Sequence, residues 1–328
     1  MPITINSIIK ISNISQDRFS KKEHQVIMLY LPYYSLKEEP FQDTANPKFF
    51  WFGEEQSEAI AILKFGIDKG EGITLLTGDI GVGKTILAKY LAGLLDDTYK
   101  IVKVDDSDLD TKDFLLFLAD SFKLPTNFDD KKSFFRYIDE EYSKTQKRML
   151  IILDEAHRAT RSLLNDIDLM AKIKRDNEKL INIILVGQTP LIELVKEIKA
   201  NGNGHRHSIV CHLRPLTKTE TNKYIKHRLK IAGTERNLFS SGAIGKIFQI
   251  SGGIPRVINT ICDHAMMIGY STDSKKIKTS VIKECAEDLQ IRNRVFGNGK
   301  DPAGKTSGEK IVKQAYNRTK QKLFTWTS

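Results

Sequence analysis

Residues 75–95 read LLTGDIGVGKTILAKYLAGLL and combine a short apolar run, a turn with three glycines and an amphipathic helix. From Gly78 to Thr85 the turn follows G-x-x-x-x-G-K-[ST], the Walker A pattern. Glycines adopt backbone angles closed to other residues, so successive N–H groups can point at an anion. The following helix aims its positive dipole end at the same place. The stretch therefore predicts a phosphate-binding loop between a buried strand and a helix.

Two side chains of this loop add specific chemistry. Lys84 carries a mobile positive charge for the outer phosphates, and Thr85 offers a hydroxyl to magnesium. The alternative is a chance match to the pattern in an ordinary strand–turn–helix. The apolar run before the loop counts against this alternative. We therefore expect ATP and Mg²⁺ as ligands. The residues expected around the nucleotide are Gly78, Asp79, Ile80, Gly81, Val82, Gly83, Lys84, Thr85 and Ile86.

A second motif is RMLIILDEAH at 148–157. Its apolar run is too short for a helix and is followed by two acids, Asp154 and Glu155. Asp154 at a strand end is placed to hold magnesium opposite Thr85. Glu155 is placed to polarise a water aimed at the γ-phosphate, so hydrolysis is favoured. A lone Asp-Glu pair after a buried strand is common without function. The letters DEAH also occur in one class of helicases, but the chain has no Ser-Ala-Thr motif.

A strand is also expected at YKIVKVDD, residues 99–106, between these two motifs, and two further strands follow RMLIILDEAH. LINIILVGQTPL at 180–191 closes on Gln188, which is expected near the attacking water unless it is a simple strand-ending polar residue. NGNGHRHSIVCHLRPL at 201–216 predicts a turn, then Arg206 and a fifth strand. The histidines of this second stretch lack an accompanying carboxylate or cysteine cluster, so they do not indicate a zinc site.

After Pro215 the pattern changes to helices only. A threonine N-cap and a stopping glycine bound the first of them, and Pro255 suits the first turn of the third. Arg256 falls off the apolar stripe of that third helix. The four predicted helices span 217–233, 240–253, 254–271 and 278–291.

Composition and charge set broader limits on the 328-residue chain. It is 40% hydrophobic and 28% charged, with no apolar run of the roughly 18 residues that a membrane helix requires, and we expect no signal peptide. Its three cysteines lack C-x-x-C spacing, so we expect a cytoplasmic protein. Of the net charge of +10, much lies in residues 292–328, where nine Lys/Arg oppose two acids. This tail is expected to be flexible and to contact nucleic acid or an anionic membrane, unless it is merely solvated.

Five strands alternating with helices, followed by a helical bundle whose third helix begins G-x-P-R, are the plan of an AAA+ ATPase. The fold class is therefore expected to be α/β, a P-loop NTPase with a five-stranded parallel sheet and a small all-α lid. YYSLKEEPF at 33–41, the Walker A loop, LVGQTPL, HLRPLTKTETNKYIKHRL and SGGIPRVINTICDHA closely resemble the ExeA/GspA-type secretion ATPases, a group that includes related pilus-biogenesis ATPases. The resemblance runs from about residue 28 to about residue 291.

This resemblance implies a role for each matching residue. Lys84 and Thr85 would bind phosphate and magnesium, with Asp154 on the magnesium side and Glu155 as catalytic base. Gln188 would be the first sensor and Arg256 the second, and Arg206 would be an arginine finger acting in trans, with Arg214 a weaker alternative. A finger in trans implies a homo-oligomer, expected to be a ring favoured by ATP.

Four regions are expected: an N-terminal extension at 1–27, the nucleotide-binding domain at 28–214, the lid at 215–291 and the tail at 292–328. The resemblance implies an ATPase that drives assembly of a secretion or pilus system through protein partners. A DNA-associated regulator is the alternative, since ATPases that select transposition targets share this AAA+ subtype. A third possibility is a nucleotide-gated scaffold with little turnover, against which Glu155 and Arg206 count.

Overall fold

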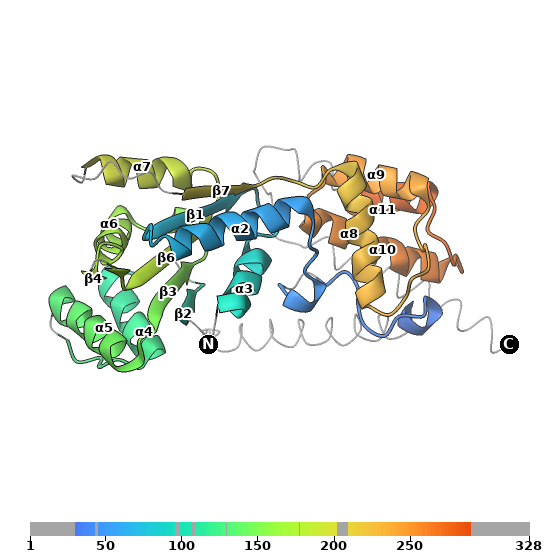
Figure 1. Ribbon diagram of the computed structural model, residues 1–328. Helices are drawn as coiled ribbons and strands as arrows, with labels where there is room; N and C mark the ends of the chain where they lie inside the picture. The colour runs from blue at the N-terminus through green and yellow to red at the C-terminus, as the bar shows by residue number, and fades with distance from the viewer. Residues whose placement is uncertain are drawn as a thin grey trace, which may run out of the picture. The chain divides into compact units, whose positions relative to one another are not determined.

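The computed structural model describes residues 30–42, 45–95, 99–105, 109–128, 130–176, 178–201 and 209–289 (Figure 1). The chain divides into two compact units, one formed by Ala45–Pro215 and the other by the segments before residue 45 and after residue 215. The expected N-terminal extension at 1–27 and the basic tail at 292–328 lie outside the described residues. In the described part of the chain, no helix is both long enough and apolar enough to cross a membrane.

The first unit, Ala45–Pro215, is built on a five-stranded parallel sheet in the order β2-β3-β6-β1-β7 (Figure 1). This confirms the predicted α/β class and the five predicted strands. The strands are β1 (Ile73–Gly78), β2 (Tyr99–Val104), β3 (Arg148–Leu153), β6 (Ile181–Gly187) and β7 (Ile209–Leu213). Because the strands are parallel, β1, β3 and β6 all end at one edge of the sheet, with β6 between the other two.

Both faces of the sheet are covered, which explains why its inner strands β3 and β6 are almost continuously apolar. In β6, Ile183 and Leu185 face one core cluster, and Ile184 and Val186 face the other. The first cluster includes residues of α4 (Thr111–Phe122), α5 (Lys131–Thr145), α6 (Arg161–Met170) and α7 (Leu191–Asn201). The second includes residues of α2 (Glu54–Asp68) and α3 (Lys84–Leu95).

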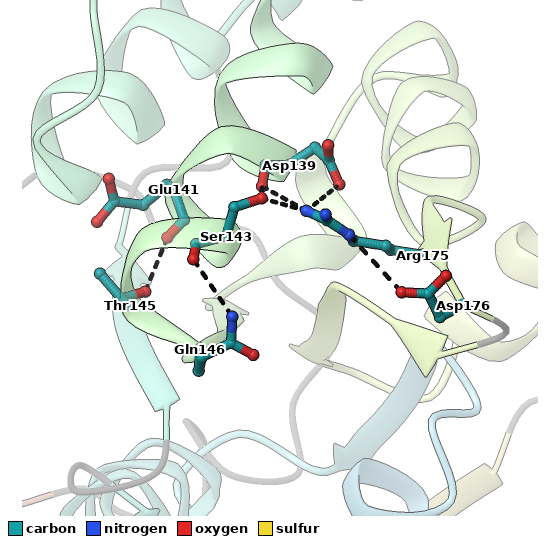
Figure 2. Close-up of polar contacts among 7 residues, drawn as sticks. All are labelled: Asp139, Glu141, Ser143, Thr145, Gln146, Arg175 and Asp176. Carbon is teal, nitrogen blue, oxygen red and sulfur yellow. Dashed lines mark hydrogen bonds and ion pairs between the residues drawn. The ribbon is translucent and has the colours of Figure 1, made fainter.

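A small antiparallel hairpin, β4 (Lys174–Arg175) with β5 (Glu178–Lys179), precedes β6 and was not expected from the sequence. Figure 2 shows how Arg175 ties it to α5. The Arg175 guanidinium donates to the backbone oxygen and the carboxylate of Asp139, at 3.5 and 3.4 Å, and to the hydroxyl of Ser143. Two-residue strands have too little periodicity to be recognised in a sequence.

After Pro215, the described residues of the second unit form four helices, in agreement with the helical pattern predicted there. A capping box joins Thr217 and Glu220 at the start of the first helix, and Pro255 occupies the first turn of the third. The helices are α8 (Lys218–Ile231), α9 (Ser241–Ser251), α10 (Pro255–Ser271) and α11 (Thr279–Leu289).

The described residues 30–42 also belong to this second unit, whereas the sequence predicted them to be part of the nucleotide-binding domain. Tyr30 and Tyr34 are fully buried, and the Tyr30 hydroxyl donates to Asp263 of α10 at 2.8 Å. The buried Arg228 of α8 donates to the backbone oxygens of Pro40 and Gln42. The segment thus satisfies a buried guanidinium, a long-range contact that local sequence pattern does not reveal.

Candidate active site

The loop between β1 and α3 has the backbone that a phosphate cradle requires. Gly78, Gly81 and Gly83 have φ angles of +148°, +83° and +107°, in the region that side chains disfavour. At Gly78 a Cβ atom would also lie 2.5 Å from the backbone oxygen of Leu213. A glycine is therefore needed there for both conformation and space.

The Lys84 side chain folds back into this loop. Its Nζ donates to the backbone oxygens of Gly78 at 2.9 Å and Asp79 at 2.8 Å, and the residue is only 7% exposed. The first turn of α3 begins at the same residue, so the ammonium and the helix N-terminus share one location. This is the arrangement that a bound phosphate chain would require.

Thr85 and Asp154 meet at the edge of the sheet. Thr85 Oγ1 donates to Asp154 Oδ2 at 2.8 Å, while Asp154 Oδ1 accepts the backbone N–H of Glu155 at 2.9 Å. Asp154 is 5% exposed, and the Lys103 ammonium of β2 lies 3.8 Å from Asp154 Oδ2. A buried carboxylate needs such partners. The oxygens of Thr85 and Asp154 are the hard ligands that Mg²⁺ prefers.

Glu155 has an unusual backbone for a non-glycine residue. Its φ of +50° places it in the left-handed region, two residues after the end of β3. Its side chain is 48% exposed, in contrast to the buried Asp154 beside it. The turn therefore separates the two acids into one buried carboxylate and one solvent-accessible carboxylate. This division suits a metal ligand and a water-activating base.

His157 lies between Glu155 and Gln188. Its Nε2 is 3.6 Å from Glu155 Oε2 and 2.8 Å from the terminal amide of Gln188. Its Nδ1 accepts the backbone N–H of Gln188 at 3.4 Å, which places the imidazole proton of a neutral ring on Nε2. The Gln188 atom at this contact is its amide nitrogen, so exchange of the amide oxygen and nitrogen would give the Nε2–H an acceptor. The imidazole thus joins the ends of β3 and β6.

No role for His157 or Lys103 is predicted from the sequence. His157 stands within the letters DEAH. The glycine at position 187, just before Gln188, leaves room for the His157 imidazole. A Cβ at Gly187 would lie 3.2 Å from the backbone nitrogen of His157 and 3.3 Å from its Nδ1. Lys103 stands in the β2 strand, and only the pairing of β2 with β3 brings it to Asp154.

The three arginines named from the sequence differ in placement. Arg206 lies outside the described residues. Arg214 forms an ion pair with Glu55 of α2, with Arg214 Nε 2.7 Å from Glu55 Oε2, so it is engaged within its own unit. Arg256 is exposed in the first turn of α10 in the helical unit, as its place off the apolar stripe predicts.

His157 provides the first testable prediction. For the ATP hydrolysis that the sequence predicts, we expect His157→Ala to lower kcat about 10-fold, or about 1.4 kcal/mol, because Gln188 and Glu155 lose the group between them. The Kd for ATP should stay unchanged, since Lys84 and the glycine loop are untouched. Steady-state kinetics and equilibrium nucleotide binding measure the two effects. His157→Gln, which retains a donor amide, should recover part of kcat, and an unaltered kcat in His157→Ala would contradict the positioning role.

The chain is similar in sequence to known proteins. Residues 67–195 match the family model described as AAA domain. The chain is 31% identical over 253 residues to general secretion pathway protein A of Aeromonas hydrophila, covering 76% of this chain and 46% of that protein. The chain spans about half the length, or less, of the curated relatives it matches.

Solved structures show the same fold. Cdc6p of Pyrobaculum aerophilum superposes with a TM-score of 0.59 and 17% identity, covering 71% of this chain and 66% of that one. The ORC2 protein of Aeropyrum pernix superposes with a TM-score of 0.56 and 15% identity, covering 76% and 71%. At these identities the likeness concerns the fold alone.

Proposed function

We propose that this chain, an AAA+ protein that resembles general secretion pathway protein A, binds ATP with Mg²⁺ and hydrolyses it to ADP and phosphate. The observation that carries the proposal is the meeting of three groups at one sheet edge. These are the glycine loop with Lys84, the Thr85–Asp154 pair, and Glu155 with its neighbour His157.

Each group has one task in this proposal. The loop amides and Lys84 hold the phosphates, and Thr85 and Asp154 hold magnesium, which would offset the charge that develops on the phosphates. Glu155 accepts a proton from the attacking water. Gln188 orients that water or the γ-phosphate, and His157 fixes the position of the Gln188 amide.

The direct test is phosphate release by the purified full chain. Release from ATP should require Mg²⁺ and should stop on addition of EDTA. ATP binding without any phosphate release, at every protein concentration, would favour the nucleotide-gated scaffold.

Assembly is part of the proposed mechanism, because an arginine finger at Arg206 would act on the site of a neighbouring subunit. The pairing of Arg214 with Glu55 supports Arg206 as the finger. Arg256 would act as the second sensor. We further propose that the chain drives assembly of a secretion or pilus system through protein partners in the cytoplasm, on the basis of its similarity to general secretion pathway protein A.

A mixing experiment tests assembly. Arg206→Ala and Glu155→Gln subunits should each be inactive alone, and their mixture should regain part of the activity. The reason is that some interfaces then combine an intact Arg206 with an intact Glu155. Specific activity should also rise with protein concentration, and ATP should increase the mass measured by light scattering. A monomer under all nucleotide conditions, with no regain on mixing, would refute a finger in trans.

A further inference from the structure

The helical unit contains a pocket of about 550 Å³ that has no part in the nucleotide site described above. Three lysines line it, Lys218 and Lys226 of α8 and Lys276 before α11, together with Asn222 and Ser241. No carboxylate is among the lining residues. A pocket with this lining selects for an anion.

The fold brings the three lysines together from distant parts of the chain. Lys218, Asn222 and Lys226 lie four residues apart on α8 and therefore share one face of the helix. Lys276 is held in place by a parallel β-bridge between Phe239 and Ile277, the neighbour of Lys276. In this bridge the backbone N–H of Ser240 donates to the backbone oxygen of Ile277 at 2.9 Å. The bridge holds Lys276 beside the segment that leads into α9.

The lysine charges are not neutralised locally. All three residues are exposed, and none forms an ion pair with any residue in the described part of the chain. Lys230, further along α8, shows the usual alternative, since it pairs with Glu235 at 3.1 Å. Three like charges around one concave surface raise the local potential and attract anions.

Uncharged groups of the pocket also suit a phosphate. The first turns of α8 and α9 both line it through Lys218 and Ser241, so two helix N-termini contribute their positive ends. Asn222 has a buried side-chain oxygen with no hydrogen-bond partner among the described residues. If the amide oxygen and nitrogen of Asn222 are exchanged, its NH₂ group becomes a hydrogen-bond donor for a phosphate in the pocket. Buried polar atoms are normally satisfied, so this amide points to a polar ligand.

The distribution of charge indicates a polymer rather than a small anion. Residues 216–289 contain twelve Lys/Arg and seven Asp/Glu, so the positive excess extends beyond the pocket. A polyanion with regularly spaced phosphates can contact the pocket and this wider surface at once. We propose that the lysine pocket of the helical unit binds the phosphodiester backbone of DNA.

The test measures the salt dependence of binding between the full-length chain and a fluorescent DNA duplex. In the test variant Lys218, Lys226 and Lys276 are each changed to Gln, which removes the charges but keeps side-chain length. The control changes Lys223, Lys278 and Lys283 to Gln, three exposed lysines of the same unit that do not line the pocket. Both variants lose the same net charge.

Each lost phosphate contact lowers the slope of log K against log salt by about 0.9, so the test variant should lose up to about 2.7. The control should change the slope by less than about 1. Equal slopes in test and control variants would overturn the proposal. It would also be overturned if the test variant lost binding to phosphatidylglycerol vesicles, or lost ATP-dependent assembly, while DNA binding stayed intact.

Basal ATPase activity and the melting temperature, measured on the same samples, separate this proposal from the proposed function. Both should be unchanged in the test variant, because its lysines lie outside the nucleotide site. Absence of ATPase activity in all three proteins would refute the proposed function and leave the DNA result standing on its own.

Discussion

Replacing Glu155 by Gln is expected to lower kcat for ATP hydrolysis by about 10²- to 10⁴-fold, the usual contribution of a general base. Gln has nearly the same size and shape as Glu, so the left-handed backbone turn after β3 should be kept. What is lost is the carboxylate that accepts the proton of the attacking water. Phosphate release under saturating ATP measures the effect.

Nucleotide affinity distinguishes loss of the base from loss of the site. ATP binding by Glu155→Gln should equal that of the unaltered chain, because Lys84, Thr85 and Asp154 remain. Glu193→Gln is a suitable control, since Glu193 is an exposed acid of α7 that pairs only with the nearby Lys196 in the contacts seen. A normal rate of hydrolysis in Glu155→Gln would show that another group is the base.

Replacing Lys84 by Ala is expected to weaken ATP binding about 10- to 150-fold. Charge-assisted hydrogen bonds to phosphate contribute about 1.5–3 kcal/mol, and each 1.4 kcal/mol corresponds to a factor of ten in Kd. Hydrolysis should fall with binding. Calorimetric titration of the nucleotide measures the change in Kd.

The control for this experiment lies on the same helix. Lys89 of α3 is partly exposed and lies outside the loop, so Lys89→Ala should bind ATP normally. Melting temperatures are needed for both variants, because Lys84 also bonds two backbone oxygens of the loop. Unchanged ATP affinity in a folded Lys84→Ala protein would exclude this loop as the nucleotide site.

The α/β class and the position of the phosphate loop were accessible from the sequence because both depend on local features. Left-handed glycines in the loop, apolar runs of strand length and helix caps such as Thr217 act over a few residues. The parallel strands then had to end at one edge of the sheet, which explains why Thr85 and Asp154 meet across 69 residues of chain.

Contacts that depend on which elements become neighbours were not accessible in the same way. Pairing of β2 with β3 places Lys103 beside Asp154, and the place of β6 next to β3 brings Gln188 to His157. Residues 30–42 join the helical unit because Tyr30 and Arg228 find partners there.

The lysine pocket shows the difference most clearly. In the sequence Lys218, Lys226 and Lys276 are three among many lysines, and no spacing marks Lys276 as their companion. The bridge between Phe239 and Ile277 makes them line one pocket. Local backbone preferences and the pattern of apolar residues are determined by residues that are adjacent in the sequence. Which charged side chains share a surface depends instead on packing between distant segments, because only the closed core sets their positions.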